Sequence, residues 1–184
     1  GCYWPTTIEA PPPPPALSGT VRADVAVVGG GVTGLSAALH LARAGADVAL
    51  IDMHAPGWGA SGRNGGFACL GGAGLSPAAI ARRHGAEEAA RFHAAERAAV
   101  EQVARVLEEE GIAADTHSRG ETVLAHSPRA FGALRAAAPA LAARYGAPVR
   151  LIWPGDLAGE GLGAVGLHGG LEVGLGFALN PLKY

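Results

Sequence analysis

The sequence is poor in cysteine, aromatic residues and basic charge, and it has no long hydrophobic run. Its two cysteines, Cys2 and Cys69, are too few for a disulfide framework and stand at no metal-ligand spacing, so we expect neither a disulfide scaffold nor a metal site. A net charge of −2 provides no basic surface for nucleic acid. No apolar stretch reaches the roughly 18 residues of a membrane span, and no secretory signal is visible. We therefore expect a cytoplasmic protein that binds neither nucleic acid nor a membrane.

Proline is concentrated near the N-terminus. The run Pro11–Pro15 favours polyproline II, which can join neither a helix nor a central strand, and it follows the aromatic group Tyr3-Trp4-Pro5. A ligand for an SH3-type domain is conceivable, but no basic residues flank the run, so a stiff arm on the domain surface is the favoured interpretation. Residues 1–20 are assigned as this proline-rich arm.

Residues 24–52 have the pattern of a βαβ unit that binds a dinucleotide. The run 24–28, which is apolar except for Asp24, predicts a strand buried on both faces of a parallel sheet. The run that follows it is Gly29-Gly30-Gly31-Val32-Thr33-Gly34. In such a motif Gly29 permits a tight turn, Gly31 leaves room for a pyrophosphate, and Gly34 lets the next helix pack closely on the strand.

The elements after these glycines complete the unit. Residues 32–44 have helical periodicity with Gly45 just past the end, and residues 48–51 predict the second strand. The start of the helix would direct N–H groups and the positive end of its dipole at a phosphate. Asp52 ends the second strand, where an acid usually accepts hydrogen bonds from ribose hydroxyls. Its carboxylate would repel a 2′-phosphate, so NADP is disfavoured.

A second glycine-rich segment lies in the long loop that follows, over residues 53–74. It reads Gly57-Trp58-Gly59-Ala60-Ser61-Gly62-Arg63-Asn64-Gly65-Gly66-Phe67. Arg63 can pair with a phosphate, Ser61 and Asn64 offer short hydrogen-bonding side chains, and the glycines keep Cβ atoms away. Loops of this length in a compact domain are usually functional. The segment suits a cofactor that continues beyond a pyrophosphate.

Together the two segments resemble the FAD-dependent amine and amino-acid oxidases of the D-amino-acid oxidase superfamily. The resemblance is greatest to the branch of the gamma-glutamylputrescine oxidoreductases, in which a βαβ unit precedes a run like GWGASGRNGG. It implies that the first segment surrounds the FAD pyrophosphate, that Asp52 holds the adenosine ribose, and that the second segment follows the pyrophosphate, ribityl and flavin portions. The cofactor-binding residues that we infer are Gly29, Gly31, Val32, Thr33, Gly34, Asp52, Met53, Ala60, Ser61, Arg63, Asn64, Gly65 and Gly66. The departure from the family is Asp52, where glutamate is more usual.

The resemblance also implies the reaction, oxidation of the C–N bond of an amine or amino acid. Hydride passes formally to flavin N5, and water hydrolyses the imine. No Ser/His/Asp or Cys/His set indicates nucleophilic catalysis, and we nominate no catalytic residue. Two alternatives remain open: a non-catalytic FAD- or nucleotide-binding module, and an NAD-dependent dehydrogenase on the same βαβ unit. The second leaves residues 61–66 unexplained.

The remaining residues predict mixed helices and strands. Ser76-Pro77 begins a helical pattern that breaks at Gly85 and ends at Gly111, residues 115–126 suggest a β-hairpin, and Ser127-Pro128 begins a helix that Pro139 must kink or split. The buried stripe expected in the first pattern is Phe92, Ala99, Val103, Val106 and Leu107, and the charged residues between them, Glu96 included, are expected on a solvated face.

Several other side chains have a functional and an ordinary interpretation. Cys69, Trp58 and Phe67 could lie near the cofactor, and Arg119 could bind a substrate carboxylate. Packing under the loop, or a surface turn for Arg119, explains them as well. The seven histidines are scattered and predict structural or surface roles.

The predicted fold class is α/β, and α+β overall. A Rossmann-like FAD-binding domain over 21–112 precedes residues 113–184, which begin an antiparallel substrate domain and the return to the FAD domain. Members of the family it resembles are considerably longer, and missing strands would leave sheet edges and apolar faces uncovered. We therefore expect an incomplete fold, a fragment or truncated gene product with little activity of its own.

Overall fold

The computed structural model describes residues 1–9, 12 and 14–184, so the predicted polyproline segment at 11–15 falls partly outside the described residues. Contacts divide the chain into two compact units. Unit 1 contains Gly1–Gly66, Ala113–Asp115 and Leu179–Tyr184, and unit 2 contains Phe67–Ile112 and Thr116–Ala178. The functional boundaries predicted at 20/21 and 112/113 concern cofactor and substrate binding, and they remain a prediction.

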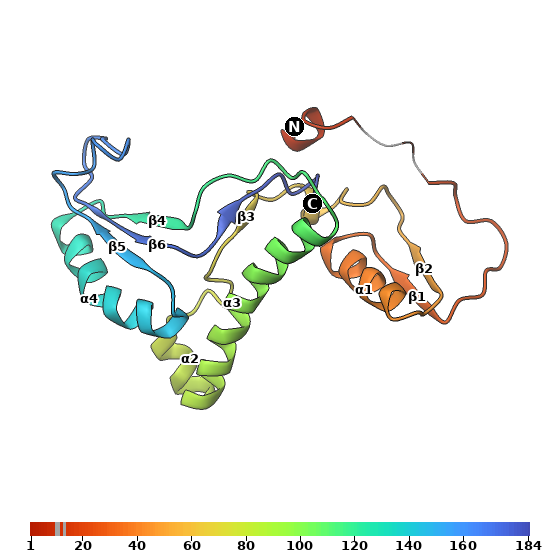
Figure 1. Ribbon diagram of the computed structural model, residues 1–184, viewed down its shortest axis with the longest axis horizontal. Coiled ribbons are helices and arrows are strands. Elements are labelled where there is room, and N and C mark those ends of the chain that lie inside the picture. Colours follow the sequence, from red (N-terminus) through yellow and green to blue (C-terminus); the bar gives the residue numbers. More distant parts are fainter. Residues whose placement is uncertain (10–11, 13) are drawn as a thin grey trace. The chain divides into compact units, whose positions relative to one another are not determined.

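Unit 1 is built on the predicted βαβ unit. Strand β1 (Val25–Val28) and strand β2 (Val48–Ile51) are parallel, with Val25 opposite Val48. Helix α1 (Val32–Arg43) connects them and packs on both (Figure 1). Gly45 follows the helix with φ +90°, the left-handed conformation that glycine adopts most easily. The order and bounds of these elements agree with the prediction from sequence.

The expected burial of β1 on both faces is wrong. Val25 and Val27 are half-buried, whereas Ala26 is exposed and Val28 is 80% exposed. Successive side chains of a strand point to opposite faces, and α1 covers only the face of Val27. The prediction assumed a sheet with helices on both sides, whereas the described part of unit 1 has two strands and one α-helix.

Unit 2 contains an antiparallel sheet in the order β4-β6-β5, as the predicted fold class requires. Its strands are β4 (Glu121–Leu124), β5 (Val149–Ile152) and β6 (Gly170–Val173). Helix α4 (Pro128–Tyr145) packs against β5 and β6 (Figure 1), around a core of Tyr145, Ala147, Leu171 and Val173. A short pair, β3 (Phe67–Ala68) with β7 (Phe177–Ala178), extends the unit.

The helices of unit 2 begin as predicted. Helix α2 (Pro77–His84) and helix α3 (Ala86–Glu109) are separated at Gly85, which has φ +88°. The Ser76 and Ser127 hydroxyls accept hydrogen bonds from backbone N–H groups three residues later, at 3.2 and 3.1 Å. Helix α4 continues through Pro139, so the predicted split does not occur.

The expected hairpin over 115–126 is wrong. Strand β4 pairs with β6, and His117 forms an isolated bridge with Ala178. Leu171 and Val173 of β6 are buried and offer β4 an apolar partner strand, which the residues before the turn do not. Strand β4 therefore pairs with a distant apolar strand and not with its neighbour in sequence.

The buried stripe of α3 also differs from the prediction. Ala99 is exposed and Val106 is buried, while Phe92, Val103 and Leu107 are half-buried. The other fully buried positions of α3 are Ala89, His93 and Val100. The buried face of α3 therefore lies at a different angle around the helix from the predicted stripe. It packs on α2 and α4, and it includes a buried polar side chain, His93.

In the described part of the chain, no helix has the length and apolar character that crossing a bilayer requires. Over the same residues, no cluster of three or more His, Cys, Asp or Glu side chains is arranged to hold a metal ion.

Candidate cofactor site

The first glycine-rich segment is a turn with close contacts at two of its glycines. A Cβ on Gly34 would overlap the carbonyl oxygen of Gly29, and a Cβ on Gly31 would lie 2.8 Å from Ser61 Oγ. Gly29 has φ +112° and donates its N–H to the Ile51 carbonyl at 2.8 Å. The turn therefore holds the start of α1 tightly against the end of β1, as the motif predicts.

The start of α1 is in direct contact with the second glycine-rich segment. The N–H of Val32 donates to Ser61 Oγ at 3.0 Å, and Ser61 lies in the short helix η2 (Ala60–Gly62). The first N–H groups of a helix have no acceptor within it, so Ser61 satisfies one from outside. The Ser61 hydroxyl keeps its own proton, which remains able to donate to a ligand oxygen. Two segments separated in sequence thus meet at one point beside bare backbone.

Asp52 connects the end of β2 to the first segment. Its Oδ2 accepts from the N–H of Gly30 and its Oδ1 from the N–H of His54, both at 2.6 Å. These hydrogen bonds, that from Gly30 foremost, lower the pKa of the Asp52 carboxyl, so the group is ionised at neutral pH. Each carboxylate oxygen can still accept a further hydrogen bond. The geometry is compatible with the ribose contact inferred from sequence, which remains a proposal.

The loop after β2 returns to contact the turn at Gly29–Gly34. The N–H of Gly57 donates to the Gly30 carbonyl at 2.9 Å, and a Cβ on Gly30 would lie 3.3 Å from Pro56 Cα. The side chain of Met53 is 88% exposed and contributes no contact of this kind. Nothing in the sequence motif indicates the role of Gly57, because it depends on a backbone contact across the loop.

The second segment is ordered by its own side chains. Asn64 Nδ2 donates to the Ser61 carbonyl at 2.8 Å and to the Ala60 carbonyl at 3.2 Å, and Asn64 Oδ1 accepts from the N–H of Gly66 at 2.8 Å. Gly65 lies exposed within this turn. The Asn64 side chain therefore fixes the backbone of this turn.

Arg63 is stacked instead of extended. Its guanidinium lies 4.3 Å from the ring centroid of Trp58, and the other partner of that ring is His54, at 3.9 Å between centroids. A stacked guanidinium keeps its donors at its edge and remains charged. Among the predicted residues, Arg63 and Asn64 thus contact their own glycine-rich segment. Ser61 and Asp52 instead accept hydrogen bonds from the first glycine-rich segment.

One residue beside this segment was missed from sequence. The indole Nε1 of Trp4 donates to the carbonyl of Asn64 at 2.7 Å, across 60 positions of the chain. The sequence predicts the aromatic group near the N-terminus only as part of an arm. A tryptophan in a short proline-containing segment gives no indication of its partner.

Fold and site together have the features of the Rossmann class, with glycines at the turn, the start of a helix directly after it and a carboxylate after the second strand. The family model described as "FAD dependent oxidoreductase" (DAO) matches residues 24–184. The chain belongs to this family.

Curated relatives match a shorter stretch. Over 64 residues the chain is 55% identical to the probable oxidoreductase OrdL of Rhizobium meliloti (strain 1021) and 50% identical to gamma-glutamylputrescine oxidoreductase of Escherichia coli (strain K12). Each match covers 35% of this chain and 15% of the relative. The resemblance inferred from the two glycine-rich segments is confirmed.

Solved structures match most of the chain. Glycine oxidase from Bacillus cereus ATCC 14579 is 25% identical, with a TM-score of 0.63 over 88% of this chain and 41% of the other. Glycine oxidase from Geobacillus kaustophilus is also 25% identical, with a TM-score of 0.62 over 89% and 42%. The chain spans less than half the length of these oxidases.

Proposed function

We propose that this chain binds FAD and serves in the oxidation of the C–N bond of an amine or amino acid. The observation that carries the proposal is the hydrogen bond between Val32 N–H and Ser61 Oγ. It joins the second glycine-rich segment to the start of α1, where a pyrophosphate binds in this fold. A cofactor that ended near the pyrophosphate would leave the second segment without a ligand.

The residues present fit FAD, and their proposed roles follow from their positions. Gly31, Val32, Thr33 and Gly34 surround the pyrophosphate with the start of α1, where the two glycines add no side chain and the Val32 N–H orients the Ser61 hydroxyl. Asp52 accepts from the adenosine ribose, with Met53 beside it. The segment from Ala60 to Gly66 follows the pyrophosphate, the ribityl chain and the flavin.

FAD, when bound, supplies the two-electron acceptor. The chain's own contribution is binding and charge. Arg63 brings a positive charge that a phosphate or a reduced flavin would favour, and the Ser61 hydroxyl can donate to a phosphate oxygen. No residue here is assigned to proton transfer from the substrate.

The relatives support the substrate class. One is named for gamma-glutamylputrescine and others for glycine, an amine and an amino acid. This chain covers only 15% of the first and 41% of the second, so the reaction of the complete enzymes is proposed for it and not observed.

The proposal is tested in two stages. FAD is added to the purified chain, and unbound FAD is removed; we expect a retained visible flavin spectrum. Under anaerobic conditions, amines and amino acids are then added, and bleaching of that spectrum by any of them supports oxidation at a C–N bond. A chain that stays colourless overturns the proposal. Retention of FAD with no bleaching by any amine or amino acid supports the non-catalytic alternative.

Replacement of Ser61 by alanine tests the observation that carries the proposal. The S61A variant loses the acceptor for the Val32 N–H and a donor toward the phosphate, and we expect the Kd for FAD to rise about tenfold, the effect of one or two hydrogen bonds. Fluorescence titration with FAD measures it.

Two further variants control for this. Ser61→Thr keeps the hydroxyl and should retain most of the affinity for FAD. Ser18→Ala changes an exposed serine 43 positions before Ser61 and should leave the Kd for FAD unchanged. Equal affinity in S61A and the unaltered chain would contradict the assigned role.

A further inference from the structure

The second glycine-rich segment is held from outside at its C-terminal end. Gly66 is buried with φ +74°, and a Cβ on it would overlap the Leu179 carbonyl oxygen. The same Cβ would lie 3.2 Å from the Trp4 ring and 3.3 Å from Pro181 Cδ. The Gly66 carbonyl accepts from the Leu179 N–H at 2.9 Å. Chain segments from both ends of the sequence therefore enclose one glycine of the proposed FAD site.

The N-terminal segment that reaches this point has a defined conformation. Trp4–Thr6 form the short helix η1, and the N–H groups of Thr6 and Thr7 donate to the carbonyls of Tyr3 and Trp4 at 2.9 and 3.0 Å. The Thr7 hydroxyl also donates to the Trp4 carbonyl at 2.7 Å. Trp4 itself donates its indole N–H to Asn64. A preformed turn thus presents Trp4 to the segment.

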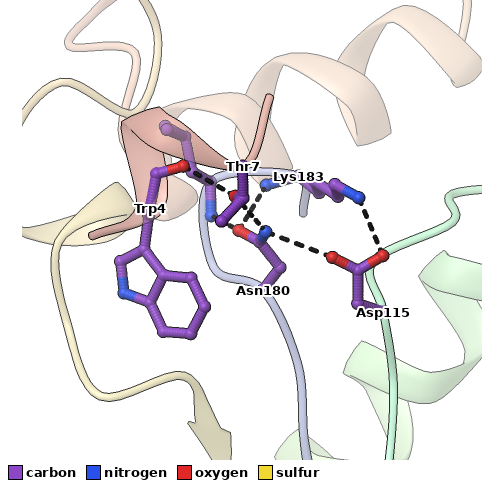
Figure 2. A network of polar contacts seen from close by, with 6 residues as sticks. Trp4, Thr7, Asp115, Asn180 and Lys183 are labelled. Carbon is purple, nitrogen blue, oxygen red and sulfur yellow. Dashed lines mark hydrogen bonds and ion pairs between the residues drawn. The ribbon is translucent and has the colours of Figure 1, made fainter. Parts of the chain in front are cut away.

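Asn180 fastens this turn (Figure 2). Its side chain is buried, with the residue 2% exposed, and Nδ2 donates to Thr7 Oγ1 at 2.7 Å and to Asp115 Oδ2 at 3.3 Å. Its Oδ1 accepts from the N–H groups of Leu182 and Lys183 at 3.1 and 3.4 Å. The Asn180 side-chain amide therefore joins the turn at Tyr3–Thr7 to Asp115 and to the turn that contains Leu182 and Lys183.

Asp115 completes the arrangement at a cost in backbone conformation. It has φ +50°, unusual for a residue other than glycine, and its Oδ1 forms an ion pair with Lys183 Nζ at 2.7 Å (Figure 2). The hydrogen bond from Lys183, with that from Asn180, lowers the pKa of Asp115. Conformations of this kind persist where surrounding contacts impose them, often at functional sites.

We propose that Trp4 and Asn180 are positioning residues of the cofactor site, which fix the backbone of Asn64–Gly66 for the flavin-side half of FAD without touching it. The inference rests on the proposed function. The turn at Tyr3–Thr7 is then part of the proposed cofactor site instead of a spacer on the surface. Removing its contacts should weaken FAD binding selectively, because the adenosine side is held by Gly29–Gly34 and Asp52, which the arm does not contact in any described interaction.

The test compares FAD with ADP, which lacks the flavin-side half. Trp4→Phe removes the indole N–H and keeps an aromatic ring. We expect its Kd for FAD to rise about fivefold to tenfold, as the loss of one hydrogen bond predicts, while its Kd for ADP stays within about twofold of the unaltered chain. Thr7→Val removes the acceptor for Asn180 Nδ2. It should raise the Kd for FAD by a smaller factor and leave the Kd for ADP within about twofold. Tyr3→Phe, in the same turn, is the matched control and should leave both unchanged.

Hydrogen exchange in the absence of ligand gives a second readout. In Trp4→Phe we expect the amides of Gly66 and Leu179 to exchange about fivefold faster, with the amides of β1 and β2 unchanged. Equal FAD affinity in Trp4→Phe and the unaltered chain overturns this inference and leaves the proposed function standing. An equal loss for FAD and ADP also overturns it, because the turn would then support the whole fold. Failure of the unaltered chain to bind FAD overturns the proposed function itself.

Discussion

Replacement of Gly34 by alanine is expected to abolish FAD binding and to destabilise unit 1. The added Cβ would overlap the carbonyl oxygen of Gly29, a backbone atom that cannot move without displacing β1 or α1. Overpacking of this kind destabilises a fold by about 3 kcal/mol, and the shift of α1 would move the N–H groups to which we assign the pyrophosphate. We expect the Kd for FAD to rise at least about 100-fold. Fluorescence titration and urea unfolding of the purified variant measure the two effects.

Gly59 provides the matched control. It lies in the second glycine-rich segment with φ −79°, and a Cβ on it would meet no atom within 4 Å. Gly59→Ala should therefore leave both FAD affinity and stability nearly unchanged. If Gly34→Ala bound FAD as well as Gly59→Ala does, the close approach of α1 to the glycine turn would not be the feature that forms the site.

Replacement of Glu96 by alanine is expected to destabilise unit 2 strongly. Glu96 Oε2 accepts from the Tyr145 hydroxyl at 2.8 Å and lies 3.0 Å from His93 Nδ1, and Oε1 accepts from the N–H of Gly71 at 3.2 Å. The side chain of Glu96 is 11% exposed, and its removal takes a charged acceptor from the buried Tyr145 hydroxyl, which keeps only the longer contact with His93 Nδ1 at 3.2 Å among the described hydrogen bonds. Such a loss is worth about 2–4 kcal/mol. Urea or thermal unfolding of the variant measures it.

Glu88 on the same helix is the control. Its carboxylate pairs with Arg91 at 3.0 Å on the exposed face of α3, where an ion pair contributes about 0.5 kcal/mol or less. Glu88→Ala should therefore unfold almost as the unaltered chain does. A similar small effect for Glu96→Ala would show that the buried network adds nothing to stability.

The same network predicts how stability varies with pH. Burial opposes ionisation of Glu96, but the hydrogen bonds from His93, Tyr145 and Gly71 outweigh it, and the pKa of Glu96 falls below its ordinary 4.5. Its contribution is therefore complete above about pH 4.5 and is lost as the pH falls through the lower, folded value. Burial, with the carboxylate of Glu96, raises the pKa of Tyr145 from 10.0 to about 12, so stability is also lost as the pH rises from 10.0 toward 12. In Glu96→Ala, unfolding curves measured from acid to alkaline pH should lose the acid slope and keep a reduced alkaline slope, because burial of Tyr145 remains.

The local part of this structure was predictable from sequence, and the long-range part was not. The turn at Gly29–Gly34, the end of α1 at Gly45 and the break at Gly85 follow from glycine's conformational freedom and from periodicity, which act within a few residues. The pairing of β4 with β6 and the partner of Trp4 depend on residues far along the chain. A sequence pattern carries no direct sign of such partners.

Glu96 illustrates the same limit. Its position among charged residues of α3 predicted a solvated face, and the i,i+4 pairs of Arg91 and Arg97 agree with that interpretation. Glu96 itself is buried because Tyr145, 49 positions later, supplies a hydroxyl donor. In the cofactor site, the role of Gly34 was predicted correctly, whereas the exposed face of β1 was not, since burial depends on every layer of the sheet.

We propose that the second glycine-rich segment makes this site one for FAD instead of NAD. Titration of the purified chain with FAD and with NAD, in parallel with Ser61→Ala, tests it most directly. We predict that the unaltered chain binds FAD at least about tenfold more tightly than NAD, and that Ser61→Ala loses most of this preference by weakening FAD alone. Binding of NAD as tight as FAD, with both unaffected by Ser61→Ala, would contradict the account.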